Sequence, residues 1–309
     1  MAEITKVKTA NHEEWLKLRS QYIGGSDAAA VVGLNAYASP YSLWAEKTGK
    51  VSGFAGNLAT EVGTYLEEFV AQKFAQVTGK KVRKCNQSFL NSQYPFAIAN
   101  IDREIVGEDA GLEIKTTDTL NMGKFKGGEY PANYYAQMVH YMAVTGKQRW
   151  YLAVMIGNKE FKWFVLERDE AEIAALMSAE AMFWDFVKKD IPPAVDGTQA
   201  TSEALKSIYA DSDDSVADLY SYASDLKRYM ELKKQIKELE TMADELANQV
   251  KEFMGSSGNG ECDGFKVSWK SQIRKTFDAK KFAKENPDID LSCYYKTTNA
   301  RTFRVSETN

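Results

Sequence analysis

The stretch that decides the fold reads ANIDREIV over residues 99–106 and GLEIKTT over residues 111–117. Successive side chains of an extended strand point to opposite faces, so GLEIKTT places its leucine and isoleucine on one face and Glu113 and Lys115 on the other. One face suits a hydrophobic core and the other carries charge. Glycine and aspartate between the two segments predict a turn, so we expect a hairpin that sets Asp102 beside Glu113.

Two neighbouring carboxylates repel each other unless a cation lies between them. Mg²⁺ suits Asp102 and Glu113, because this hard ion binds one or two carboxylates together with waters and phosphate oxygens. Lys115 could then orient or help deprotonate the attacking water, or stabilise charge that develops on a phosphate. The alternative interpretation is structural, since Glu-x-Lys on a strand is usually a solvated ion pair.

Composition sets the class of protein. The chain has 309 residues, 44% of them hydrophobic, and a net charge of −4. It shows neither a membrane-length apolar run nor a signal peptide, so we expect a soluble protein of the cytoplasm. Cys85, Cys262 and Cys293 are too few and too scattered for a disulfide framework and are expected to be reduced. With this net charge, any binding to nucleic acid must come from local basic patches.

Hydrophobic periodicity predicts an α/β (α+β) fold with a mixed sheet flanked by helices. The pattern is strand, strand, helix, strand, strand, and the helix reads ANYYAQMVHYMAVTG at residues 132–146. Such an order is typical of a sheet with a crossover helix. Further helical patterns lie at 13–20, 26–33, 39–50, 63–80 and 170–190, and further strand patterns at 87–106, 149–157 and 159–169.

The C-terminal third has a different organisation. We expect a core over residues 1–195, a linker over 196–214, a long helix or helical hairpin over 215–255, and a small basic strand–helix–strand segment over 256–309. Apolar residues recur at three- and four-residue steps in the long helical segment, which could pair between subunits or fold back on itself. The basic stretch 262–281 could contact phosphates or single-stranded nucleic acid, or could be a solvated surface.

The ordered set of motifs resembles the YqaJ-like viral recombinase family. This family is related to lambda exonuclease and belongs to the restriction-endonuclease-like nucleases with the PD-(D/E)xK signature. The matching segments are LRSQYIGGSDAAAVVG, GTYLEEFVAQKF, the aspartate followed by GLEIKTT, YYAQMVHYMAVTG and FWDFVKKDIPP, at residues 18–33, 63–74, 102–117, 134–146 and 183–193.

The resemblance implies a Mg²⁺-dependent exonuclease, with Mn²⁺ as the alternative ion and one or two ions per subunit. It would degrade one strand of linear duplex DNA from its 5′ end and leave 3′ tails. The implied partners are DNA ends, other subunits in a ring of three or four, and a single-strand annealing recombinase of phage recombination. Phage or prophage origin in a bacterial host follows from the same resemblance.

The resemblance also implies a ligand set and catalytic residues. Asp102, Glu113 and the carbonyl of Ile114 would bind metal together with a glutamate of the 63–74 helix. That glutamate is Glu67 or its neighbour Glu68, and Gly63 one helical turn earlier favours Glu67. Lys115 and Gln137 would complete the catalytic set, with Tyr134 supporting Gln137 or touching DNA. We expect His140 on the same helix to be structural.

A terminal phosphate could bind where a helix begins at GGSDAAAVV, with Ser26 or Asp27 as the N-cap. The resemblance gives Arg19 and Ser26 the role of anchoring a 5′-phosphate; a plain capped helix is the alternative. Two other functions stay open for the whole chain. One is an endonuclease or nickase on the same core, and the other is a DNA-binding scaffold without catalysis.

Overall fold

A computed structural model describes residues 3–296 and 301–307. The chain divides into two compact units, one up to residue 209 and the other from residue 210.

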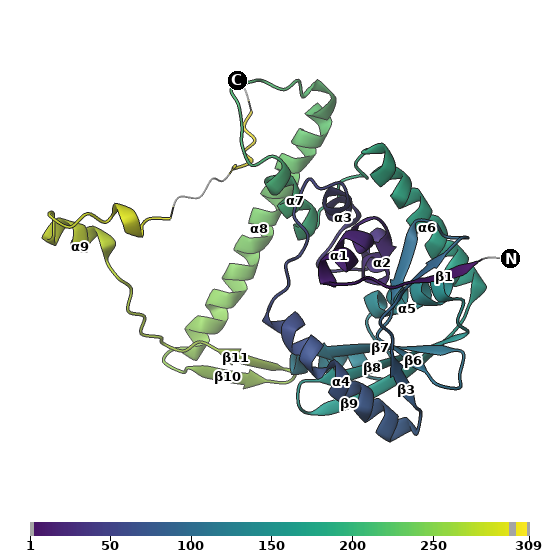
Figure 1. The fold of residues 1–309 in the computed structure, drawn as a ribbon. Coiled ribbons are helices and arrows are strands. Elements are labelled where there is room, and N and C mark those ends of the chain that lie inside the picture. Colours follow the sequence, from purple (N-terminus) through teal and green to yellow (C-terminus); the bar gives the residue numbers. More distant parts are fainter. Residues whose placement is uncertain (1–2, 297–300, 308–309) are drawn as a thin grey trace. The chain divides into compact units, whose positions relative to one another are not determined.

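The first unit is built from two sheets and the helices around them (Figure 1). Its strands are β1 (Ile4–Val7), β2 (Ile23–Gly24), β3 (Val82–Lys84), β4 (Ser88–Asn91), β5 (Ala97–Asn100), β6 (Arg103–Ile105), β7 (Ala110–Thr117), β8 (Arg149–Ile156) and β9 (Glu160–Glu167). Its helices are α1 (His12–Ser20), α2 (Gly25–Val31), α3 (Pro40–Lys47), α4 (Leu58–Thr78), α5 (Ala132–Thr145), α6 (Glu170–Lys189) and α7 (Gln199–Ile208), with a 3₁₀ helix η1 (Thr119–Phe125).

The larger sheet has the strand order β3-β6-β7-β8-β9. All its neighbours are antiparallel except β7 and β8, which run parallel and are joined through α5. The predicted mixed sheet with a crossover helix is therefore confirmed. One detail differs: β4 and β5, expected as part of the same sheet, pair with β1 and β2 in a separate sheet of order β1-β4-β5-β2.

The expected hairpin forms between β6 and β7. Its register pairs Arg103 with Leu112 and Glu104 with Gly111, and the turn passes through Gly107 at φ +86°. Extending this register by one residue places Asp102 opposite Glu113.

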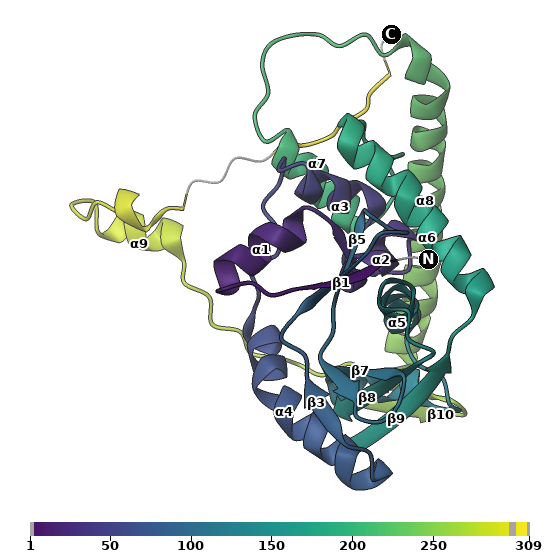
Figure 2. The ribbon, with the colours of Figure 1, turned by 45° about the vertical axis from the view of Figure 1, so that its right-hand side comes forward.

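The two faces of β7 meet different helices (Figure 1 and Figure 2). Leu112 and Ile114 are buried against Val70 and Phe74 of α4. The opposite face carries Glu113, which touches α5. The alternation seen in the sequence therefore separates a hydrophobic core from a charged, buried layer within one strand.

Gly111 allows the side chain of Trp150 on β8 to pack closely against β7. A Cβ at this position would lie 2.4 Å from the indole ring of Trp150, its neighbour across the β7–β8 ladder. Trp150 is fully buried and packs against the ring of Tyr141, with 5.1 Å between centroids. Glycine is needed here for close approach and not for an unusual backbone angle.

The region expected as a linker contains α7. This helix packs on α3, where the hydroxyls of Ser39 and Thr201 lie 2.7 Å apart and are both buried. Ala204 of α7 joins a cluster that includes Trp44 and Phe183. Since α7 is amphipathic and its apolar side has a partner, the first unit extends to residue 209.

The second unit contains η2 (Tyr220–Tyr222), α8 (Ala223–Met254), β10 (Asn259–Cys262), β11 (Phe265–Ser268), α9 (Ala279–Glu285) and η3 (Ser292–Tyr294). The predicted long helical segment is one uninterrupted helix, α8, which begins at residue 223 instead of 215. The first predicted strand of the basic segment is a two-stranded hairpin, β10–β11. No strand follows α9 in the described residues, and 297–300 lie outside them.

Gly111→Ala should destabilise the first unit by roughly 1–3 kcal/mol, because an added methyl must displace the closely packed Trp150 ring. Urea unfolding followed by tryptophan fluorescence measures the change. Gly123→Ala is the matched control, since a Cβ there meets nothing within 4 Å. Equal unfolding midpoints for the two variants would contradict this account of Gly111.

Candidate functional site

The hairpin sets two carboxyl groups side by side. Glu113 is only 2% exposed, and Asp102 beside it is partly exposed. The Asp102 carboxylate is oriented by the backbone, because its Oδ2 accepts a hydrogen bond from the N–H of Ile114 at 2.8 Å. Strand pairing thus fixes the position of both side chains before any ligand binds.

Burial raises the pKa of Asp102 well above its usual value, and the neighbouring charge of Glu113 raises it further. Lys115 and the hydrogen bond from Ile114 act in the opposite direction but do not restore the usual pKa. The site therefore holds an excess of negative charge whenever both carboxyls are ionised, which is the condition that favours a bound cation.

Lys115 lies on the same face of β7 as Glu113. Its Nζ is 2.6 Å from Glu113 Oε1 and 5.3 Å from the centre of the Tyr134 ring. Burial by itself would lower the pKa of Lys115, but the charges of Glu113 and Asp102 outweigh it and raise the pKa. Lys115 is therefore an ammonium ion in this arrangement, which suits it to stabilise negative charge.

Gln137 of α5 approaches the carboxylates from the helix side. Its Nε2 donates to Glu113 Oε1 and to the hydroxyl of Tyr141, each at 2.8 Å. Tyr141 in turn packs on Gly25, where a Cβ would lie 2.4 Å from the tyrosine ring. A continuous set of contacts therefore links Glu113 to the start of α2.

Glu113 Oε2 is the carboxylate oxygen best suited to bind a metal ion. It is buried and has no hydrogen-bond partner, whereas Oε1 receives both Lys115 and Gln137. An unpaired buried carboxylate oxygen is unfavourable unless something binds it. The oxygen donors of Asp102 and Glu113 fit a hard divalent cation, which completes its shell with water and substrate oxygens.

The predicted third carboxylate, Glu67, is paired with Arg103, although its charge also contributes to the raised pKa of Asp102. Glu67 Oε1 forms a short ion pair with Arg103 Nη1, and Glu68 Oε2 lies 3.0 Å from Arg103 Nη2. Within residues 3–296 and 301–307, no group of three or more His, Cys, Asp or Glu side chains is gathered as a metal cluster. Gly63 lies close to β7, since a Cβ there would be 3.2 Å from Thr116 Oγ1.

Arg19 and Ser26 are brought together, as the sequence suggested. Arg19 Nη2 donates to Ser26 Oγ at 2.6 Å and lies 3.7 Å from Asp27 Oδ1. Asp27 also contacts the buried ammonium of Lys47, with 2.8 Å between Oδ2 and Nζ. Burial alone would raise the pKa of Asp27, but Lys47 and Arg19 outweigh it and hold the pKa below its usual value.

The prediction that Ser26 or Asp27 caps the N-terminus of α2 is wrong. Gly24, and not Ser26 or Asp27, is the N-cap, and its N–H donates to Asp27 Oδ2 at 3.0 Å. The helix begins earlier because Ile23 and Gly24 pair with β5 in a parallel ladder, which leaves Gly25 as the first helical residue. Ser26 is consequently inside the first turn, with its hydroxyl available to Arg19.

The structural role predicted for His140 is confirmed. The imidazole is fully buried, with Nδ1 2.8 Å from Glu180 Oε1 and Nε2 3.0 Å from the carbonyl oxygen of Ile98. It links α5 to α6 and β5.

Sequence reasoning missed Arg103, Tyr141 and Lys47. Arg103 is next to Asp102, Tyr141 is one helical turn after Gln137, and Lys47 belongs to a Glu-Lys pair that reads as a surface. Of these three residues, only Arg103 and Tyr141 could have been found from their spacing to Asp102 and Gln137 in the sequence.

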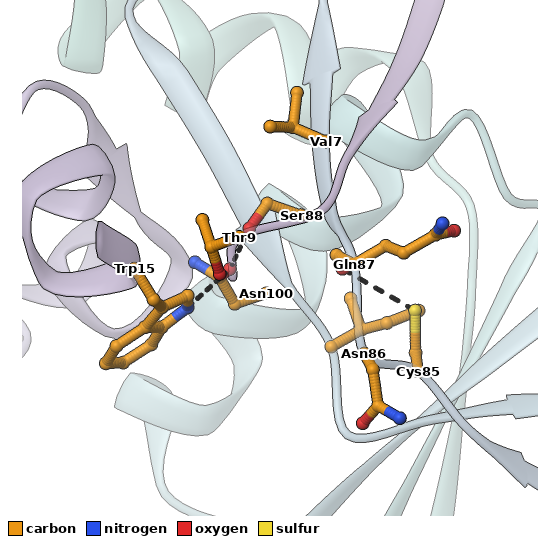
Figure 3. A pocket seen from close by; sticks show the side chains of 9 residues that line it. Val7, Thr9, Trp15, Cys85, Asn86, Gln87, Ser88 and Asn100 are labelled. Atoms are coloured by element: carbon orange, nitrogen blue, oxygen red, sulfur yellow. Dashed lines mark hydrogen bonds between the residues drawn. The ribbon is translucent and has the colours of Figure 1, made fainter. Parts of the chain in front are cut away.

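A separate small cavity lies between α1 and the β4–β5 sheet (Figure 3). It has a volume of about 160 Å³, and Asn100 Oδ1 at its wall accepts hydrogen bonds from Trp15 Nε1 and Ser88 Oγ. Because these groups satisfy one another, this cavity does not present the unpaired polar atom found at Glu113.

Known proteins share both the sequence pattern and the fold. Residues 14–148 match the YqaJ-like viral recombinase domain. The uncharacterized protein YqaJ of Bacillus subtilis (strain 168) is 37% identical over 310 residues, covering 98% of this chain and 97% of the relative.

Two crystal structures of LHK-Exo, an alkaline exonuclease from Laribacter hongkongensis, are also similar. The complex with dAMP is 24% identical with a TM-score of 0.51, covering 58% of this chain and 94% of that one. The second is 21% identical with a TM-score of 0.47 and the same coverage. The first likeness shows a shared α/β fold. Among residues 3–296 and 301–307, no helix combines the length and apolar character needed to cross a bilayer.

Asp102→Asn should make the metal-free protein more stable, by roughly 0.5–2 kcal/mol at pH 8. The raised pKa means that the folded wild type holds a proton more tightly than the unfolded chain, so its stability falls as pH rises from the unfolded value of 3.8 through the folded pKa. Asparagine cannot ionise, so its advantage should shrink toward pH 4. Urea unfolding in EDTA across this range measures the difference, with exposed Asp109→Asn as control. A variant less stable than wild type at pH 8 would refute this reading.

Proposed function

Since the chain belongs to the YqaJ-like viral recombinase family, we propose that it is a metal-dependent 5′-to-3′ exonuclease acting on linear double-stranded DNA. The product would be duplex with a 3′ single-stranded tail, the substrate for recombination by strand annealing. The likeness to an alkaline exonuclease supports the fold that such a nuclease requires.

One observation carries the proposal: Asp102 and Glu113 lie side by side on a buried hairpin, with Glu113 Oε2 unpaired and Lys115 adjacent. If Glu113 and Lys115 were only a structural ion pair, the fold would not need Asp102 beside them, because two neighbouring carboxylates repel each other. The arrangement is what hydrolysis of a phosphodiester needs, because it offers oxygen donors to a cation and an ammonium group to the phosphate.

Asp102 and Glu113 would hold Mg²⁺ or Mn²⁺, as one or two ions, with the Ile114 carbonyl as a further ligand. When bound, the ion would neutralise phosphate charge and make water a better nucleophile. Glu67 remains the proposed additional ligand, and it would have to exchange its contact with Arg103 for the ion.

Lys115 and Gln137 would position the attacking water and stabilise the phosphate. Both contact Glu113 Oε1, so their polar groups converge on one edge of the carboxylate pair. Tyr134 lies beneath the Lys115 ammonium and limits the directions that it can take. This geometry supports a role in positioning for Tyr134, with direct contact to DNA as the alternative.

Arg19 and Ser26 would anchor the 5′-phosphate of the strand being degraded. The Arg19 guanidinium donates to Ser26 Oγ and forms a longer ion pair with Asp27 Oδ1 at 3.7 Å, while Lys47 holds the other oxygen of Asp27 at 2.8 Å. A phosphate could therefore use both side chains through charge-assisted hydrogen bonds.

The setting we propose is the bacterial cytoplasm, with a chain of phage or prophage origin. Several subunits, three or four, would form a ring around DNA, which would keep the enzyme on its substrate. The partner for the 3′ tail would be a single-strand annealing recombinase. These statements rest on analogy with the family.

The first test is digestion of 5′-phosphorylated linear duplex with Mg²⁺. Lys115→Ala should lower the rate by roughly 10²–10³-fold, because the transition-state charge loses its nearest cation. Asp102→Asn and EDTA should abolish degradation. Exposed Lys188→Ala, on α6, is the matched control and should leave the rate unchanged.

The substrates separate the competing functions. Strand-specific end labels should show loss from the 5′ end, and covalently closed circles should survive. Cutting of circles would replace the proposal with an endonuclease or nickase. Unchanged degradation by Lys115→Ala would remove the assigned site, and no degradation with Mg²⁺ or Mn²⁺ would favour a scaffold.

The 5′-phosphate anchor has its own test. Arg19→Ala should slow digestion of 5′-phosphorylated ends by roughly 10–100-fold while leaving 5′-hydroxyl ends nearly unaffected, because one charge-assisted contact is lost. Lys17→Ala on the same helix is the control. Equal slowing of both substrates would show that Arg19 acts on the structure and not on the phosphate.

A further inference from the structure

One face of α8 carries a heptad pattern that is uninterrupted from Tyr229 to Phe253. Apolar residues alternate at steps of three and four, which is the spacing of a coiled-coil seam. The a positions of the heptads are Tyr229, Ile236, Ala243 and Val250. The d positions are Leu232, Leu239, Leu246 and Phe253.

Within the described residues of the second unit, this seam is largely uncovered. Phe303 packs edge-on against Tyr229 at one end, with 5.7 Å between ring centroids. From Ile236 onward, every large a or d residue is at least 45% exposed, and Phe253 is 94% exposed. A continuous apolar strip of this length, on a helix of 32 residues, is unusual on a free surface.

The charges beside the seam distinguish the possible pairings with a second α8. In a parallel pair, Arg228 would face Lys233 of the second copy, which is repulsive. In an antiparallel pair, Ile236 can lie opposite Leu239 of the second copy. Lys233 then faces Glu240 of the second copy, which is attractive. The twofold symmetry of the pair repeats this contact, so that it forms twice. A shift by one heptad would set Glu240 against itself.

The attractive register also pairs the apolar part of the helix with itself. It places Tyr229 opposite Leu246 of the second copy, whereas Asp225, the next d position toward the N-terminus, lies opposite Val250 of the second copy. The apolar pairing therefore covers residues 229–246 of each helix, about 27 Å at 1.5 Å per residue. Lys233 and Glu240 have no ion-pair partner within the described part of the chain, whereas Lys234 and Glu238 pair within the helix.

We propose that α8 pairs with α8 of a second copy of this chain as an antiparallel two-stranded coiled coil, centred on Ile236 and Leu239. This contact belongs to the second unit. It is independent of the nuclease assignment and would join subunits, or rings of subunits, through their C-terminal parts.

The test is the mass of the full-length chain, measured by light scattering after size exclusion, in EDTA and without DNA. Leu239→Glu should lower the mass by at least half, because a carboxylate would be buried at the centre of the seam. Thr241→Glu adds the same charge on the outer face and should leave the mass unchanged. Circular dichroism checks that both variants keep their helix.

Charge reversal tests the direction of pairing without disturbing the seam. Lys233→Glu and Glu240→Lys should each weaken association by about tenfold, and the double variant should restore it to within about threefold. Stronger association of Lys233→Glu would overturn the antiparallel arrangement in favour of a parallel one. A wild type whose mass matches that of Leu239→Glu at all concentrations would overturn the proposal, and would indicate that the strip is covered within one chain.

Discussion

The pairing of β6 with β7 is the constraint on which the rest of the first unit depends. This ladder of hydrogen bonds sets Asp102 beside Glu113 and directs Leu112 and Ile114 into the core with α4. It also places Gly111 where the ring of Trp150 packs closely against the backbone. A slip of one residue would exchange the core and charged faces of β7. The register of β6 and β7 therefore determines both the packing of the core and the position of the carboxylates.

Arg103 shows how the fold manages the negative charge around this hairpin. Its guanidinium is 2% exposed, bridges Glu67 and Glu68, and donates to the carbonyl oxygen of Asp102 at 2.9 Å. A buried arginine without such partners would be strongly unfavourable. The same side chain therefore anchors α4 to the start of β6 and pairs with Glu67, whose charge also raises the pKa of Asp102.

The local pattern of the sequence carried much of this structure. The alternation over 111–117 predicted β7, which begins one residue earlier at Ala110, and the helical periodicity located α5 and α6 within a residue or two. The division of strands into two sheets was not predictable, because β4 and β5 are short and their partners β1 and β2 lie some 60 to 90 residues away. The helix in the supposed linker was missed because its polar residues and a nearby glycine outweighed the few apolar positions that α3 covers.

The candidate site was predictable to the extent that its members lie on one strand or one helix. Glu113 and Lys115 share a face by period alone, and Gln137 could be placed by helical spacing. The contacts that depend on the fold were not accessible: the grip of Arg103 on Glu67, the unpaired Glu113 Oε2, and the early start of α2 at Gly25. Each depends on backbone pairing between distant segments.

The packing of Tyr141 on Gly25 has a consequence for how DNA would be measured out. Tyr141 touches the first turn of α2, which carries Ser26, and its hydroxyl binds Gln137, which binds Glu113. The residues proposed to anchor the phosphate and the carboxylates are thus connected through packed and hydrogen-bonded side chains. In the proposed exonuclease these contacts would set the distance between the anchored 5′ end and the bond that is cut.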